Sequence, residues 1–147
     1  MEEGIGFVAT LSLTCMYLGD VRRAARLYDL LLPRIGEAIC LLSVYTCYGS
    51  VSYYLGLLAT LLQRWDAAEQ HFTDALAMHE RMGARPFAAH TRFAWADMLV
   101  KRDATVHHDR AIVLLDAALA TCDQLGMPVL AERALALKVR LQGILNA

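Results

Sequence analysis

The clearest pattern of apolar and polar positions lies in RWDAAEQHFTDALAMHERMGARP, residues 64–86. Apolar residues there recur at i, i+4, i+7 and i+8, which places them on one face of a helix. Asp66 followed by Glu69 is typical of a capping box at the start of this helix, and Gly83 supplies the left-handed residue that ends it. Pro86 opens the next helix, where its missing N–H costs nothing. The residues of the apolar face are Ala68, Phe72, Ala75 and Leu76.

This pattern recurs along the chain. One copy lies 43 residues later, and another lies 44 residues earlier. Gly126 and Pro128 also repeat the stop and start signals of Gly83 and Pro86. Three copies at a nearly fixed period indicate a stacked array of helices. The aligned residues are Ala24, Tyr28 and Leu31; Ala68, Phe72 and Ala75; and Ala111, Leu115 and Ala118.

A further apolar segment, SYYLGLLATLL (residues 52–62), directly precedes the helix predicted within residues 64–86. Its residues Leu55, Gly56 and Ala59 form a large, small, small pattern that would face the following helix. Each repeat is therefore predicted to be an antiparallel pair of helices, and the chain a single all-α domain. The expected pairs span about residues 5–33, 48–83 and 86–125, followed by a capping helix over 128–145, within a domain of residues 1–147.

The residues at these positions resemble the tetratricopeptide repeat, which pairs two helices with a small residue in the first and Ala, aromatic, Ala along the second. The repeats here are longer than the 34-residue standard. The chain is similar, over roughly residues 5–145, to the C-terminal repeats of large bacterial regulators that carry an ATPase or cyclase module and sometimes a LuxR-type DNA-binding domain. The resemblance implies a right-handed superhelical array with a sensory or protein-interaction role in signalling or transcription regulation. The matching residues are Gly56, Ala68, Phe72 and Ala75.

Residues 38–63 contain no charged side chain, and this length is enough to cross a bilayer. Gly49 and Ser50, however, indicate a helix boundary with Ser50 as the N-cap. The flanks carry no run of Lys or Arg that would set an orientation in a membrane. We therefore expect core and a covered surface rather than a membrane span, and the pattern leaves residues 34–48 without an assigned conformation.

Composition narrows the class of protein. With 57% apolar and 20% charged residues, the chain is more apolar than an ordinary soluble domain, so it has either a large core or a surface that becomes covered. A net charge of −1 gives no indication of a nucleic-acid or membrane partner. Met1, Glu2 and Glu3 do not resemble the start of a signal peptide, so we expect a cytoplasmic protein. The cysteines have scattered spacings, which indicates reduced thiols that act as small hydrophobic side chains. They are Cys15, Cys40, Cys47 and Cys122.

Candidate chemistry is sparse. Neither of the common nucleotide phosphate motifs occurs, and no H-E-x-x-H motif occurs. Residues 107–109, His-His-Asp, offer metal ligands, but a solvated loop is the favoured interpretation. His71 and His79 lie too far apart on one helix to chelate an ion. Cys40 and Cys47 have the chemistry to pair or to bind a soft metal, although core thiols are favoured. We expect no catalytic residue, metal or cofactor, and no enzyme activity.

A concave groove is the most concrete functional hypothesis. The first helices of successive pairs line the concave side of such an array. This surface mixes aromatic and charged groups that suit a peptide segment or a small effector. The alternative is that three pairs make too short an arc and that the surface only faces solvent. The predicted groove residues are Tyr53, Leu57, His90, Phe93, Asp97, Lys101 and Glu132.

Two other functions remain open. Tyrosines cluster in residues 38–54, and tyrosine suits interfaces that are apolar at one end and wet at the other. A homodimer that buries this segment, or an end of the array, is therefore the second hypothesis. A metal- or cofactor-binding protein that uses the Cys and His residues is the third. The candidate interface residues are Leu42, Tyr45, Tyr48 and Tyr54.

Overall fold

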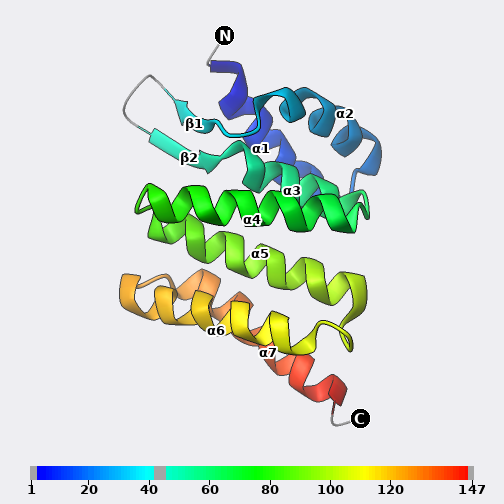
Figure 1. Ribbon diagram of the computed structural model, residues 1–147, viewed down its shortest axis with the longest axis vertical. Coiled ribbons are helices and arrows are strands. Elements are labelled where there is room, and N and C mark those ends of the chain that lie inside the picture. Colours follow the sequence, from blue (N-terminus) through cyan, green and yellow to red (C-terminus); the bar gives the residue numbers. More distant parts are fainter. Residues whose placement is uncertain (1–2, 42–45, 146–147) are drawn as a thin grey trace. The chain divides into compact units, whose positions relative to one another are not determined.

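The computed structural model describes residues 3–41 and 46–145, and its fold is all-α, as predicted (Figure 1). A short 3-10 turn, η1, and one two-stranded sheet accompany the helices. The helices are α1 (Glu3–Leu18), α2 (Val21–Leu31), α3 (Val51–Leu61), α4 (Trp65–Arg81), α5 (Arg85–Asp103), α6 (His108–Leu125) and α7 (Pro128–Leu145), with η1 at Leu32–Arg34 and strands β1 (Ala38–Leu41) and β2 (Thr46–Ser50).

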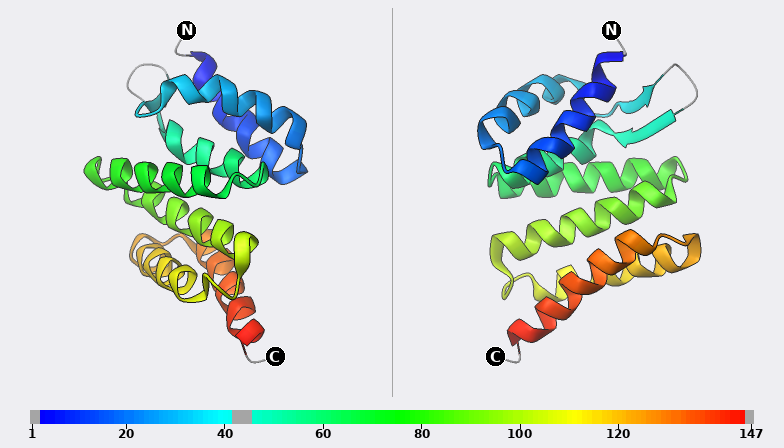
Figure 2. Two further views of the ribbon diagram at one scale, coloured as in Figure 1. Left: turned by 45° about the vertical axis from the view of Figure 1, so that its right-hand side comes forward. Right: turned by 180° about the vertical axis from the view of Figure 1, so that it is seen from behind.

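The chain divides into two compact units, residues 1–82 and residues 83–147. In unit 1, α1 and α2 pack against each other and both contact α3, and α3 packs along α4 (Figure 2). In unit 2, α6 packs along α5, and α7 packs mainly on α6 (Figure 2). Each unit thus has its own helix packing and is described by itself.

Most of the predicted helix ends are confirmed. Gly83 and Gly126 have φ of +65° and +66°, the left-handed conformation that glycine adopts without a Cβ penalty. Pro86 lies in the first turn of α5, and Pro128 begins α7. At the start of α3, the Ser50 side chain accepts a hydrogen bond from the backbone N–H of Tyr53 at 3.2 Å.

The predicted capping box at the start of α4 is wrong. The N-cap residue is Arg64, and it makes no side-chain capping hydrogen bond. Asp66 lies two positions after the N-cap, within the first turn of the helix. There its carboxylate is favourably placed near the positive end of the helix dipole, so the residue supports the helix by charge rather than as the cap.

Gly56 marks a close approach of α3 to α4. A Cβ atom built on Gly56 would lie 2.6 Å from Cε1 and 2.7 Å from Cδ1 of Phe72. The Phe72 side chain is fully buried, so the close-packed core around it holds the ring in place. The prediction that Gly56 faces the following helix is confirmed, because only a residue without a side chain lets the ring lie this close to the backbone.

The uncharged segment of residues 38–63 is divided between a β-hairpin and α3. The strands β1 and β2 are antiparallel, with a register irregularity between Ala38 and Cys40. Within the described residues, no helix has both the length and the apolar character needed to cross a membrane. The expectation that Cys40 and Cys47 are core thiols is wrong: both are exposed on the hairpin, because a two-stranded ribbon has little core of its own.

A buried junction fastens the end of the hairpin to α3 and α4. The backbone N–H of Ser50, the last residue of β2, donates to Nε2 of His79 at 2.9 Å. The hydroxyl of Tyr54 donates to the carbonyl oxygen of Tyr48 at 2.8 Å. His79 is 0% exposed, and burial lowers its pKa to about 4. The imidazole is therefore neutral at pH 7, and its Nε2 accepts the hydrogen bond from the backbone N–H of Ser50.

Replacing Gly56 with Ala should destabilise unit 1. The new Cβ would overlap the Phe72 ring. We expect the free energy of unfolding to fall by up to about 2 kcal/mol, because overpacking costs about 1–3 kcal/mol and the helix propensity gain offsets only about 1 kcal/mol of it. Urea denaturation followed by circular dichroism measures this change. Gly4→Ala in α1 meets no atom within 4 Å and is the matched control. Equal stability of the two variants would contradict the steric account.

Acidification should destabilise unit 1 through His79. The folded-state pKa of about 4 lies below the ordinary value of about 6.5, so the unfolded chain binds this proton more readily. Stability is therefore complete above pH 6.5 and declines as the pH falls toward 4, by a total of about 3 kcal/mol for this group.

The comparison variant is His79→Gln, which keeps an acceptor for the N–H of Ser50 and does not titrate. Urea denaturation at a series of pH values should give a flatter profile for the variant than for the native protein. Parallel profiles would show that protonation of His79 does not set the acid sensitivity.

Candidate functional site

The predicted groove residues belong to different units. Tyr53 and Leu57 lie in α3 of unit 1, and the other five lie in α5 or α7 of unit 2. The two groups are therefore considered separately, and a groove that joins them stays a prediction. The unit 2 residues are His90, Phe93, Asp97, Lys101 and Glu132.

In unit 1, the predicted residues lie mostly in the core. The Leu57 side chain is only 8% exposed, so it does not offer a surface to a ligand as expected. Tyr53 is half-buried. Its ring lies edge-on to Tyr54, with centroids 5.1 Å apart, and 6.4 Å from the His79 ring. These aromatic contacts indicate a packing role for Tyr53 next to the buried junction.

The candidate dimer residues of the hairpin region are likewise corrected in part. Tyr54 is 3% exposed and belongs to the core of unit 1, rather than to a surface that is open to another chain. Tyr48 is half-buried. Leu42 and Tyr45 lie outside the described residues.

In unit 2, the four predicted residues of α5 follow the spacing of one helix face, i, i+3, i+7 and i+11. His90 and Phe93, near the start of this face, are half-buried. Asp97 and Lys101, further along, form an ion pair with 2.7 Å between Oδ2 and Nζ. An exposed i, i+4 pair contributes little to stability, so the pair mainly neutralises that end of the face.

Arg133 of α7 joins this face and was not predicted. Its guanidinium carbon lies 4.9 Å from the centroid of the Phe93 ring, which is a cation–π arrangement. Arg133 and the predicted neighbour, Glu132, are both exposed. The buried residues of α7 set the phase of the helix and leave Arg133 at the edge of its packed side. The spacing of these apolar residues in the sequence was the signal that could have predicted the position of Arg133. The residues are Leu130, Ala134, Leu137 and Leu141.

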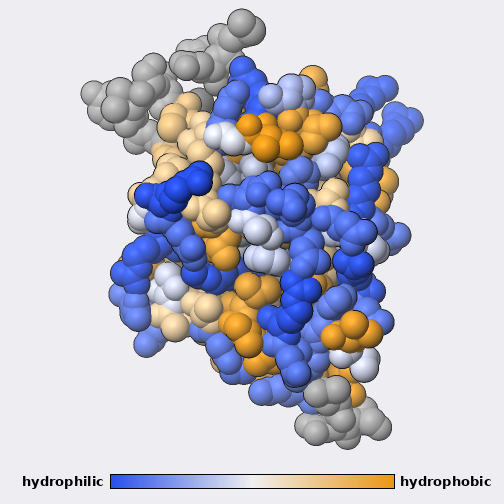
Figure 3. Space-filling view, in the orientation of Figure 1, coloured by the Kyte–Doolittle hydropathy of each residue, from blue (hydrophilic) through white to orange (hydrophobic). Residues whose placement is uncertain are grey.

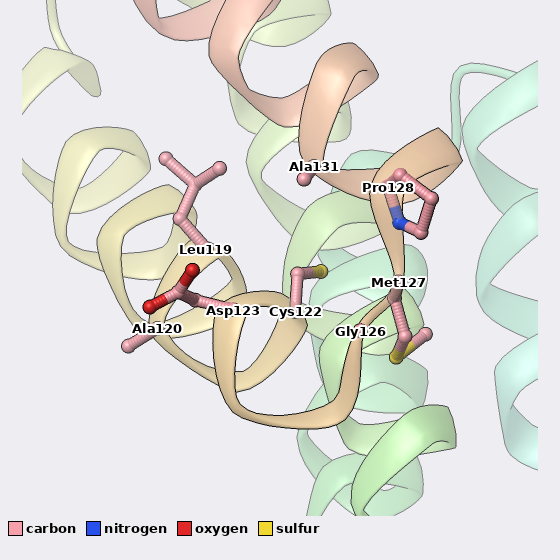
Figure 4. A pocket seen from close by; sticks show the side chains of 8 residues that line it. All are labelled: Leu119, Ala120, Cys122, Asp123, Gly126, Met127, Pro128 and Ala131. Carbon is pink, nitrogen blue, oxygen red and sulfur yellow. The ribbon is translucent and has the colours of Figure 1, made fainter.

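Two cavities lie around the turn from α6 to α7. Met127 and Pro128 line both of them. The first has a volume of about 510 Å³ (Figure 4), and its other lining residues are Leu119, Ala120, Cys122, Asp123, Gly126 and Ala131. The second has a volume of about 210 Å³, and its other lining residues are His90, Val129, Leu130 and Arg133.

The local sequence explains why this turn is well defined. Gly126 adopts the left-handed conformation that ends α6, and the backbone N–H of Met127 donates to the carbonyl of Cys122 at 2.9 Å. The Arg85 guanidinium at the start of α5 hydrogen-bonds to the Gln124 side chain at the end of α6. An apolar cluster between the helices completes the turn: Ala89, Cys122 and Leu130, with Phe93, Met127 and Ala131 packed against them.

The charges around the cavities have opposite signs. Burial, and secondarily the charge of Arg133, lowers the pKa of His90, so the imidazole is neutral at pH 7 and Arg133 is the cation at the second cavity. Asp123 brings a carboxylate to the first cavity (Figure 4). The surface around Met127 and Pro128 therefore offers an apolar wall with a cation on one side and an anion on the other.

The His-His-Asp segment has a different structure from the solvated loop that was expected. His108 begins α6, and its Nδ1 lies 3.0 Å from Oδ1 of Asp109. Nε2 of His108 and Nε1 of Trp95 are buried and have no hydrogen-bond partner among the described residues. Nor do those residues contain a group of three or more His, Cys, Asp or Glu side chains placed to hold a metal ion.

Comparison of the chain with protein-family models, with curated proteins and with solved structures finds no significant match. The resemblance to the tetratricopeptide repeat therefore stays a prediction that rests on the residues that suggested it.

Proposed function

We propose that the chain is a non-catalytic interaction module, a tetratricopeptide-like array that binds a peptide segment at the surface around Met127 and Pro128. The observation that carries this proposal is the pair of cavities, of about 510 and 210 Å³, with a shared wall at the α6–α7 turn. Concave, mostly apolar sites with a few polar groups at their edge are typical of ligand binding.

The chemistry of this surface indicates the kind of peptide. An apolar side chain suits the wall formed by Met127 and Pro128, and the thioether of Met127 adapts to irregular shapes. A neighbouring carboxylate suits Arg133, whose planar guanidinium forms two parallel hydrogen bonds with a carboxylate. A small carboxylate effector with an apolar part meets the same requirements.

The groups at the cavities support binding rather than catalysis. Burial raises the pKa of Cys122, which disfavours the thiolate that a cysteine nucleophile requires. The neutral His90 has Arg133 beside it, a cation that opposes its protonation. A role in a cytoplasmic bacterial signalling or transcription regulator is what the tetratricopeptide-like resemblance adds to the proposal.

Selection from a displayed library of random peptides tests the binding function. Peptides enriched on the purified chain should carry an aromatic or aliphatic residue close to Asp or Glu. Arg133→Gln should weaken binding of such a peptide by about two- to fivefold, since an ion pair to an exposed arginine is worth about 0.5–1 kcal/mol. Isothermal titration calorimetry measures the affinities.

The matched control is Arg140→Gln, which removes an exposed arginine about 10 Å further along α7. Changing the acidic residue of the peptide to its amide should remove the difference between native protein and Arg133→Gln. Equal binding to all three proteins, without a preference for acidic peptides, would contradict the proposed site.

Homodimerisation through α1 is a second candidate function, because this helix exposes several large apolar side chains. Phe7, Leu11 and Leu18 are 72%, 50% and 72% exposed, and their spacing of i, i+4 and i+11 places them on one face. Figure 3 shows small groups of apolar residues among hydrophilic ones on one face of the molecule. Apolar residues gathered on one exposed face are typical of a surface that another chain covers.

Native mass spectrometry tests the dimer. The native chain should have twice the chain mass, and Leu11→Asp should have the mass of one chain, because the new charge would be buried without a partner. Val106→Asp is the matched control, since Val106 is 72% exposed but lies in the connection between α5 and α6. A monomeric native chain, or a dimer that survives Leu11→Asp, would contradict this interface.

A further inference from the structure

Cys40 and Cys47 occupy directly opposite positions of the hairpin. Their Cα atoms are partners in the antiparallel register of β1 and β2, and both residues are exposed. Directly opposed residues of antiparallel strands carry their side chains on the same face of the ribbon, with Cβ atoms about 4.5–5.5 Å apart. The two thiols thus lie next to each other at the surface of unit 1.

This separation is close to that of a disulfide, in which the Cβ atoms are about 3.5–4.5 Å apart. A small change in the twist of the two-stranded ribbon would bring the two Cβ atoms into this range, since a ribbon with only one ladder is easily deformed. The sulfur of Cys47 also accepts a hydrogen bond from the backbone N–H of Gly49 at 3.4 Å. That bond restricts the rotation of the Cys47 side chain and keeps its sulfur close to the backbone of β2.

We propose that Cys40 and Cys47 form a reversible intramolecular disulfide by exchange with a small-molecule disulfide such as oxidised glutathione. The thiolate of one cysteine attacks a sulfur of glutathione disulfide, forming a mixed disulfide and releasing one glutathione thiolate. The thiolate of the second cysteine then attacks the protein sulfur of the mixed disulfide and releases the second glutathione. Each protein thiol loses a proton, the protein is oxidised by two electrons, and the glutathione disulfide is reduced to two thiols.

The disulfide would close the hairpin three residues before the buried junction. Ser50 ends β2, binds Nε2 of His79 through its N–H and caps α3 through its hydroxyl. A covalent link between β1 and β2 reduces the freedom of the ribbon that leads into this residue. This inference concerns unit 1 and does not depend on peptide binding by unit 2.

The other two cysteines are internal controls. Cys15 is 5% exposed and Cys122 is 1% exposed. Burial raises the pKa of both thiols, so they react slowly in the folded protein. A disulfide reagent should therefore distinguish the hairpin pair from the buried pair within the same molecule.

The test is oxidation of the native chain with oxidised glutathione, followed by denaturation, alkylation of the remaining thiols and peptide mapping by mass spectrometry. The expected product carries alkyl groups on Cys15 and Cys122 and contains a linked pair of peptides that holds Cys40 and Cys47. Dithiothreitol should restore all four thiols. In Cys40→Ser or Cys47→Ser, the reaction should stop at the mixed disulfide.

The contribution of the fold is measured by repeating the oxidation in urea. Ring closure in the native chain should be at least tenfold faster than in the unfolded chain, because the ladder holds the second thiol beside the first. Equal rates would overturn the proposal, as would stable glutathione adducts or intermolecular disulfides at Cys40 and Cys47 without the internal bond.

Discussion

The close contact between Gly56 and the Phe72 ring is the constraint on which unit 1 depends. It sets the register of α3 against α4, which run in opposite directions from one short turn. Ser50 precedes Gly56 by about as many residues as His79 follows Phe72. The same register therefore brings the N–H of Ser50 to the His79 imidazole at 2.9 Å. One steric fit thus places a buried polar pair two helical turns away, and that pair fastens the hairpin.

The helices were predictable because their signals are local. The spacing of Ala68, Phe72 and Ala75 defines a helix face, and Gly126 or Ser50 ends or begins a helix by its own backbone or side-chain chemistry. The hairpin was not predictable, because residues 38–48 are nearly all apolar and lack the alternation of apolar and polar positions that marks a strand with one exposed face. An apolar run such as that around Cys40 is equally compatible with a buried core, so periodicity alone misplaced its thiols.

The candidate site was predicted in part, for a related physical reason. The repeat register placed His90 and Phe93 on one face of α5, and in the structure Arg133 lies near both residues. It did not work for Leu57, because α3 is packed by α1 and α2 as well as by α4, and an apolar helix gives no sign of which face stays open. It also missed Arg133, because the rotation of α7 follows from the spacing of its own apolar residues and not from the register of the repeats.

The wall formed by Met127 and Pro128 has a consequence for selectivity between occupants. The proline ring is rigid, whereas the methionine side chain has three rotatable bonds. A group that enters the larger cavity and displaces the Met127 side chain changes the shape of the smaller one beside Arg133. Under the proposed binding function, occupation of one cavity would change the affinity of the other, and the two effects would be equal in size. Two weak chemical groups carried on one molecule would be recognised as a combination rather than as independent parts.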